Sequence, residues 1–189
     1  MSQSTFPSLK NHLLMATPNL RDPYFKGALI YICDHSEDGA MGLAINKPAD
    51  VPMSRVFDEL ELHYPEDLGK QPLLVGGPVQ QERGFVTHRA ATKQWESTMY
   101  VTPDICITAS RDIIADMAQA MGPASGYVTL GYAGWGPGQL EQELADNSWL
   151  VSEADTSILF DTPFDERLQA TATKLGFDLS RMSSQAGHA

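Results

Sequence analysis

Two histidines and one glutamate are placed in this chain where their chemistry could serve proton transfer. His35 and His88 each stand at the end of an apolar stretch beside a glycine-containing turn, and Glu141 ends a segment that contains four glycines. An imidazole held by a carboxylate can act as a general base. One hypothesis is therefore an enzyme or small-ligand-binding protein that uses His35 or His88 with Glu141. Neither histidine lies in an H-x-x-x-H or H-E-x-x-H pattern, and the alternative is that both are structural.

Familiar catalytic and metal-binding signatures are missing from the sequence. There is no G-x-S-x-G nucleophile elbow and no G-x-x-x-x-G-K-[ST] phosphate loop. Asp34, Ser36 and Asp38 match the opening of a calcium loop, but the position of its closing acid is Ile45. We therefore expect no metal site and no cofactor, and the sequence favours a non-enzymatic protein over an enzyme.

The run from Gly131 to Glu141 contains four glycines, one proline and one tryptophan, so it is selected for backbone shape. A dinucleotide-binding turn would need its third glycine at position 139, which is Gln139, and the helix that follows is too short for a crossover unit. Two interpretations remain open for Trp135. It either fills the core or is presented, with Gln139, to a ligand.

The pattern along the chain predicts strands in hairpin-like runs with occasional helices. Strands are expected at 27–33 and 40–45, joined by a polar turn at 34–39, and then at 72–75, 84–88, 99–101, 105–108, 127–130, 149–151 and 158–160. Helices are expected at 53–62, at 111–121 after the N-cap Ser110, at 139–146, and after the N-cap Thr162. A glycine loop should occupy 131–138. The strict alternation of a doubly wound fold is missing, so we expect one α+β domain over residues 1–189 with a mixed, mostly antiparallel sheet.

Charge and composition limit the partners. The net charge is −11, and eight carboxylates with no Lys or Arg lie between Gln139 and Glu166. Such a surface repels phosphate backbones and argues against direct nucleic-acid binding. The sequence shows no signal-peptide pattern and no apolar run approaching the ~18 residues of a membrane span. Cys33 and Cys106 lie in apolar runs without a nearby cysteine partner, so we expect a cytoplasmic protein with reduced thiols.

Several unusual blocks, taken in order, resemble the YqgE/AlgH family of bacterial proteins. The blocks are 13–18, Asp22-Pro23-Tyr24-Phe25, 31–48, Gly76-Gly77-Pro78-Val79, Arg83-Gly84-Phe85 with His88, 131–141 and the terminal Gly187-His188-Ala189. The resemblance implies an α+β fold with a bent, bifurcated sheet forming a pseudo-barrel, flanked by helices. It implies no defined activity. It also implies a link to transcriptional regulation, including alginate synthesis, without a known DNA-binding motif.

The leading hypothesis is a non-enzymatic cytoplasmic binding or regulatory protein with an indirect role in transcriptional regulation. Its partner would be an unknown protein or small molecule. Polar and aromatic residues on turns, without a complete catalytic set, motivate this hypothesis. The expected recognition surface consists of Asn46, Lys47, Pro48, Gly76, Gly77, Pro78, His88, Tyr132, Trp135, Gln139 and Glu141.

Overall fold

The computed structural model describes residues 6–181, and the chain divides into two compact units. Unit 1 comprises the residues up to Asn46 and those from Ala133 onward, and unit 2 comprises Lys47–Tyr132. The terminal block at Gly187-His188-Ala189 lies outside the described residues. A single domain over residues 1–189 stays a prediction.

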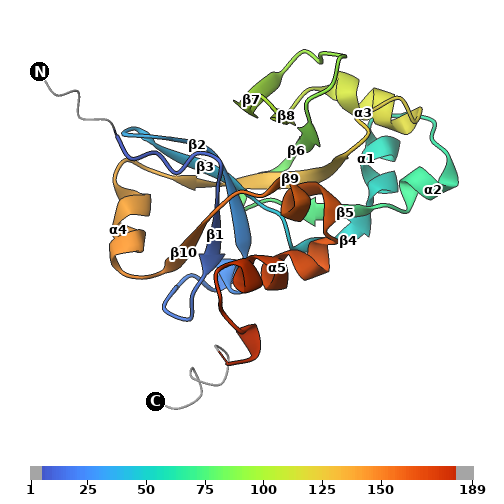
Figure 1. Ribbon diagram of the computed structural model, residues 1–189. Helices are drawn as coiled ribbons and strands as arrows, with labels where there is room; N and C mark the ends of the chain where they lie inside the picture. Colours follow the sequence, from blue (N-terminus) through green and yellow to red (C-terminus); the bar gives the residue numbers. More distant parts are fainter. Residues whose placement is uncertain (1–5, 182–189) are drawn as a thin grey trace, which may run out of the picture. The chain divides into compact units, whose positions relative to one another are not determined.

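Unit 1 is built on antiparallel strands in the order β10, β1, β2, β3 and the end of β9 (Figure 1). The strands are β1 (His12–Ala16), β2 (Leu29–Ser36), β3 (Gly39–Ala44), β9 (Gly126–Trp135) and β10 (Trp149–Glu153). The helices are α4 (Gln139–Ala145) and α5 (Arg167–Lys174), with short turns η1 (Pro23–Phe25), η2 (Ser157–Asp161) and η3 (Phe164–Glu166).

Strand β2 lies at the centre of unit 1 because its first five residues are apolar and fully buried. The expected hairpin with β3 is present, but its turn is shorter than predicted, since β2 continues to Ser36. The pairing register shifts between Ile32 and Asp34, which marks a β-bulge. Beyond it, His35 is buried whereas Asp34 and Ser36 are exposed. The polar segment expected to be a loop is therefore a strand that turns one histidine inward.

Unit 2 has strands in the order β7, β8, β6, β9, β5 and β4, with the β5–β9 pair parallel and the other pairs antiparallel. Its strands are β4 (Pro48–Pro52), β5 (Pro72–Val75), β6 (Val79–Arg89), β7 (Thr98–Thr102) and β8 (Ile105–Thr108). Its helices are α1 (Met53–Glu59), α2 (Glu66–Gly69) and α3 (Arg111–Ala118). A cluster of buried apolar side chains from α1, α3, β6 and β9 forms the core of this unit.

Several local predictions were wrong or only partly right. Residues 131–135 are not a loop, because β9 continues through Trp135 and pairs with β3. Residues 158–160 are not a strand but part of the π-helical turn η2. Ser110 does occupy the N-cap position of α3, as predicted, but its hydroxyl donates to Asp112 and makes no hydrogen bond with the helix backbone. Thr162 caps no helix, because its hydroxyl donates to the carbonyl of Ser157.

The predicted α+β fold class is confirmed. Helices accompany a mixed and mostly antiparallel sheet, which bends at several β-bulges. Across residues 6–181, every helix is too short or too polar to cross a lipid bilayer.

Candidate functional site

His35 in unit 1 does lie against Glu141, but its hydrogen bonds leave it no basic nitrogen to use. Its Nε2 is 2.6 Å from Oε1 of Glu141, and its Nδ1 is 2.8 Å from the backbone nitrogen of Leu9. A backbone N–H can only donate, so Nδ1 accepts from Leu9, and the ring proton must be on Nε2, which donates to Glu141. Both ring nitrogens are therefore occupied.

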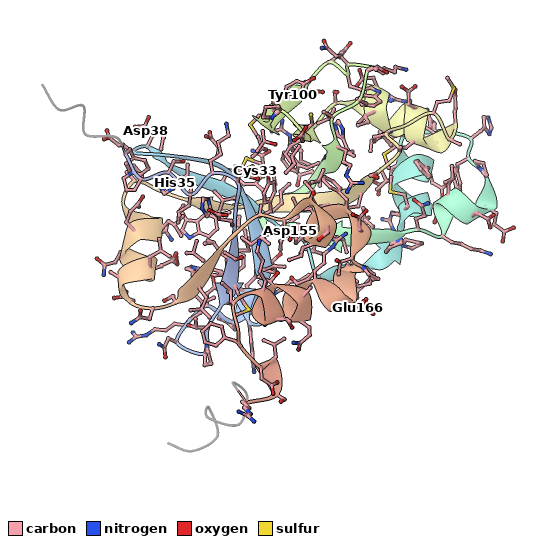
Figure 2. All side chains as sticks on the ribbon, viewed as in Figure 1. Cys33, His35, Asp38, Tyr100, Asp155 and Glu166 are labelled. Atoms are coloured by element: carbon pink, nitrogen blue, oxygen red, sulfur yellow. The ribbon has the colours of Figure 1, made fainter. Side chains whose placement is uncertain are left out.

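The surroundings of this pair agree with a structural role. The His35 side chain is 2% exposed, and Phe6 contacts its ring edge to face. Figure 2 places His35 near the tip of the β2–β3 hairpin, where Asp38 is exposed. Although desolvation raises the pKa of Glu141, hydrogen bonds from its own backbone N–H and from His35 lower it overall. The carboxylate thus stays ionised and holds the imidazole in place.

His88 in unit 2 is buried and has no carboxylate partner. Its Nδ1 is 2.9 Å from the carbonyl oxygen of Arg89, to which it donates, and its Nε2 is 2.7 Å from the hydroxyl of Thr108. Trp95 packs edge to face against the ring. Desolvation lowers the pKa of His88, although the hydrogen bond to Arg89 partly offsets this effect. The ring is therefore neutral and structural at neutral pH.

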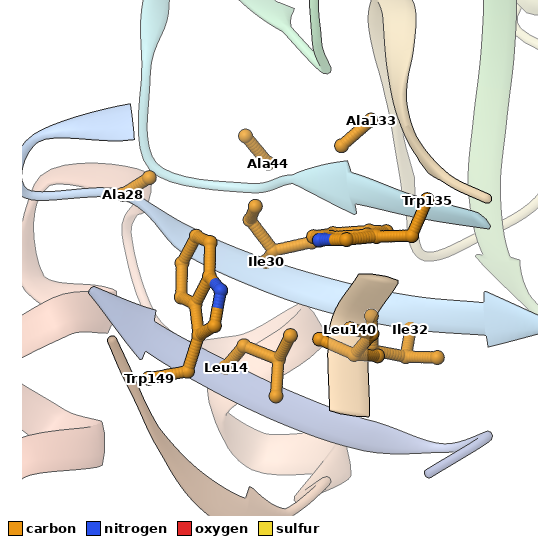
Figure 3. Packing of buried hydrophobic residues seen from close by; sticks show 9 residues of the cluster. All are labelled: Leu14, Ala28, Ile30, Ile32, Ala44, Ala133, Trp135, Leu140 and Trp149. Carbon is orange, nitrogen blue, oxygen red and sulfur yellow. The ribbon is translucent and has the colours of Figure 1, made fainter. Parts of the chain in front are cut away.

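Trp135 fills the core of unit 1, which decides between the two interpretations left open by the sequence. It is 7% exposed and packs with Leu140 and, edge to face, with Trp149 (Figure 3). Its indole N–H donates to Glu143 at 2.6 Å. Gln139 is exposed, and its side-chain oxygen accepts from the backbone N–H of Gly136 at 3.0 Å. Neither the ring nor the amide oxygen is presented to a ligand.

The glycines of unit 2 allow two backbones to approach closely. Gly131 has a φ of +73°, and a Cβ added to it would lie 2.3 Å from the carbonyl oxygen of Gly77. A Cβ on Gly76 would lie 2.3 Å from the carbonyl oxygen of Gly131. Both distances are impossible for real atoms, so these positions require glycine.

The remaining residues of the expected recognition surface differ in their contacts and in their exposure. Asn46 accepts from the N–H of Leu29 and donates to the carbonyl of Gly27, so its amide organises the start of β2. Lys47 accepts from the N–H of Val75 through its carbonyl, while Pro48 and Pro78 are exposed.

Within unit 2 the structure brings Lys47, Gly76, Gly77 and Tyr132 to the β5–β9 pair and its flanks. It does not bring His88 there. His88 pairs with Gly126, six residues before Tyr132 along β9, which is roughly 20 Å away.

A groove that sequence reasoning missed lies entirely within unit 2. Its volume is about 570 Å³, within the range of ligand-binding clefts. We call it the unit 2 groove. Its apolar lining consists of Val51, Val56, Leu60, Ile114 and Leu130, its polar rim includes Arg55, Glu59, Glu82, Ser110 and Arg111, and Gly84 contributes backbone. The apolar lining residues belong to the core cluster of unit 2 or pack against it. The groove therefore lies on the surface of that core.

The charges on the rim of the groove are partly paired. Arg55 makes an exposed ion pair with Glu59 at 2.8 Å, one helical turn away on α1. Arg111 donates to the carbonyl oxygen of Leu60 at 2.7 Å, which ties the start of α3 to the end of α1. A guanidinium has five N–H donors, so Arg111 keeps donors for a further acceptor.

Gly84 makes the groove wider than a strand residue with a side chain would. A Cβ placed on it would lie 3.8 Å from Val128 and 4.0 Å from Leu130, both ordinary contact distances. Its φ is outside the left-handed region. Neither close packing nor backbone strain therefore requires glycine at this position, in contrast to Gly76 and Gly131. The groove was not predictable from spacing, because its lining comes from β4, α1, β6, α3 and β9.

The structure contains no arrangement for a bound metal among residues 6–181, where no group of three or more His, Cys, Asp and Glu side chains converges. The Asp34, Ser36 and Asp38 pattern lies on β2 and its turn, and not in a calcium loop.

Comparison with known proteins places these observations in a family context. The AlgH-like family model matches residues 13–180. A UPF0301 protein of Saccharophagus degradans is 49% identical over 184 residues, which cover 97% of this chain and 90% of the relative. A UPF0301 protein of Nitrosococcus oceani is 46% identical over 95% of this chain and 96% of the relative.

Two solved structures resemble the fold. The solution structure of the AlgH protein from Pseudomonas aeruginosa superposes with a TM-score of 0.80 at 42% identity and covers 100% of both chains. The crystal structure of protein DIP2367 from Corynebacterium diphtheriae has a TM-score of 0.61 at 22% identity and covers 78% of this chain and 76% of that chain. The second likeness concerns the fold alone.

Proposed function

The chain belongs to the AlgH-like family, and we propose that it is a non-enzymatic binding protein whose ligand occupies the unit 2 groove. The observation that carries the proposal is a cleft of about 570 Å³ that combines an apolar lining with a charged rim. Ligand sites typically have this composition, with a few polar groups that orient the ligand in an apolar cleft.

The histidines support binding over catalysis. A general base needs a free nitrogen within reach of the substrate. In His35 and His88 both ring nitrogens are engaged by protein groups, and both side chains are buried. Neither histidine lines the unit 2 groove. The alternative, an enzyme that uses one of them with Glu141, thus has the less favourable geometry.

A regulatory role would act through a protein or small-molecule partner. The net charge of −11 opposes direct contact with a phosphate backbone. An indirect role in transcriptional regulation would therefore depend on what the groove binds. Cys33 and Cys106 are free and buried thiols, which supports our placement of the protein in a reducing compartment such as the cytoplasm.

The groove can be tested with 8-anilinonaphthalene-1-sulfonate, a fluorescent probe that joins apolar rings to an anionic sulfonate. We expect the rings to contact Leu60 and Leu130 and the sulfonate to lie near Arg111. The variant Gly84→Val narrows the groove with a β-branched side chain that suits a strand. It should weaken probe binding by at least about ten-fold, since single methylene groups in apolar pockets have effects of this size.

The matched control is Gly136→Val in unit 1, where nothing lies within 4 Å of an added Cβ and φ is not left-handed. It should leave probe affinity within two-fold of the wild type. Thermal melts of both variants establish that they fold, and Gly84→Ala replaces Gly84→Val if the larger side chain unfolds the protein. Equal affinity for the wild type and a folded Gly84 variant would contradict the proposal.

A further inference from the structure

Strand β6 has an edge that its neighbour β8 leaves open. β6 runs from Val79 to Arg89, but β8 pairs only with its last four residues, and the register ends at the pair Val86 and Thr108. On its other side, β6 remains paired with β9 back to Gly84. The segment before Val86 therefore has a strand on one side and no β8 partner on the other.

The hydrogen-bonding groups of Gly84 point toward this open edge. The N–H of Arg89 donates to Ser125, on the β9 side, whereas the N–H of Ala90 donates to Asp104, on the β8 side. Backbone groups alternate in direction along a strand, and the β6–β9 register is regular from Gly84 to His88. Gly84 thus has the orientation of Ala90 and directs its N–H and C=O to the place where β8 would continue.

The open edge borders the unit 2 groove. Gln81, Glu82 and Gly84 line the groove from β6. Ala109, Ser110 and Arg111 line it from the segment in which the chain leaves β8 and enters α3. The space between these two walls is therefore the space that a longer β8 would fill. A glycine within a strand also lets another backbone approach closely.

We propose that the ligand of the unit 2 groove is an extended polypeptide segment, which adds to the edge of β6 as a strand beside Gly84. The inference rests on the proposed function and names the class of its ligand. Backbone hydrogen bonds supply affinity in this mode, and alternate side chains enter pockets and supply specificity. Alternate apolar side chains of the segment contact Leu60, Ile114 and Leu130.

Charge complementarity adds to the recognition of this segment. Arg111, which has N–H donors to spare, selects an acidic side chain, and Glu82 on the β6 wall selects a basic one. The segment is short, because the β6–β9 register shifts between Val79 and Gly84 and Gln80 has a φ of +47°. This irregularity interrupts the edge and protects it from pairing along its whole length.

The test begins with a phage-displayed heptapeptide library selected on the full-length protein and counter-selected on Gly84→Val. The best peptide is synthesised, and each of its amides is N-methylated in turn, which removes one donor and crowds one edge of the peptide. A strand bound to β6 presents alternate amides to it. We expect N-methylation at every second position to weaken binding at least ten-fold, and at the positions between to change it less than three-fold.

Hydrogen exchange at the amide of Gly84 is the second measurement, and the bound peptide should slow it at least ten-fold. Any of three outcomes overturns the inference. They are failure to select any peptide, equal tolerance of N-methylation at all positions, and loss of binding on N-methylation at every third or fourth residue of the peptide. If the peptide inference fails but Gly84→Val still weakens binding of the fluorescent probe, the proposed function stands and only the peptide inference is overturned. If neither probe nor peptide depends on Gly84, the proposed function falls as well.

Discussion

At the scale of single residues, the side chains best suited to chemistry serve to hold the structure. His35 connects three segments of unit 1, since its ring accepts from Leu9 and donates to Glu141 while its carbonyl accepts from the hydroxyl of Ser8. An imidazole that accepts at Nδ1 and donates from Nε2 is held in a single tautomer. The residue type suggests a general base, but both ring nitrogens are engaged by protein groups, and neither is free to contact a substrate.

Substitutions of His35 and Glu141 distinguish the hydrogen-bonding role of this pair from the contribution of its charge. His35→Leu leaves the partly buried N–H of Leu9 without its acceptor, so we expect it to cost about 1–2 kcal/mol. Glu141→Gln keeps an oxygen that accepts from His35, so it should cost less than about 1 kcal/mol. Urea unfolding monitored by circular dichroism measures both values. A larger loss in Glu141→Gln than in His35→Leu would contradict the assigned tautomer.

At the scale of elements, glycines in the same strand pairings have different physical roles. Gly131 in β9 has a left-handed φ and touches the backbone of Gly77, whereas Gly84 in β6 has room for a side chain. The sequence marks both as glycine and cannot rank them. Only the neighbouring strand decides whether a Cβ is tolerated.

We expect Gly131→Ala to destabilise the protein by about 2–4 kcal/mol, because the added Cβ combines backbone strain with a backbone clash. Gly136→Ala should be neutral or stabilising by up to about 1 kcal/mol, because its site is open and alanine restricts the unfolded chain. The shift in the urea midpoint of each variant checks the expectation. Similar destabilisation by both variants would show that the close approach at Gly131 is not the cause.

At the scale of the whole molecule, two effects of acid oppose each other. Protonation reduces the net charge of −11 and hence the self-repulsion of the folded chain. Specific hydrogen bonds act in the other direction. Hydrogen bonds from Lys93 and Trp95 lower the pKa of Asp116, and hydrogen bonds from the hydroxyl and backbone N–H of Ser157 lower the pKa of Asp155. Groups whose pKa is lower in the folded state bind protons more readily when unfolded, so their stabilisation is lost as the pH falls.

The melting temperature should therefore change little between pH 8 and pH 6 and then fall by about 5–10 °C toward pH 3, because the lowered pKa values of Asp116 and Asp155 matter most around and below their ordinary range near pH 4. His88 contributes to the part of the fall nearest pH 6. Desolvation lowers its pKa in the folded state, so the unfolded state binds the proton more readily as the pH falls. Calorimetry at several pH values measures the curve. Repetition in about 0.5 M salt screens the general repulsion, so the fall should persist there. A melting temperature that rises steadily to pH 3 would contradict the dominance of these hydrogen bonds.

The order of apolar and turn-forming residues was sufficient to predict the α+β class and the hairpin of β2 and β3. Local pattern determines these features because strand and turn propensities act over a few residues. It was insufficient for residues 131–135, where pairing with β3 overrides the glycines, and for residues 158–160, which form a π-helical turn.

The sequence by itself determined the charge and the fold class of this protein, because these depend on composition and on short-range order, and its blocks in order carried the resemblance to the family. The tertiary structure decided that Trp135 is a core residue and that His35 and His88 have no free nitrogen. It also decided where the groove lies. Val51, Leu60, Gly84, Ile114 and Leu130 are far apart in sequence, and they meet only because β4, β6, β9, α1 and α3 pack together.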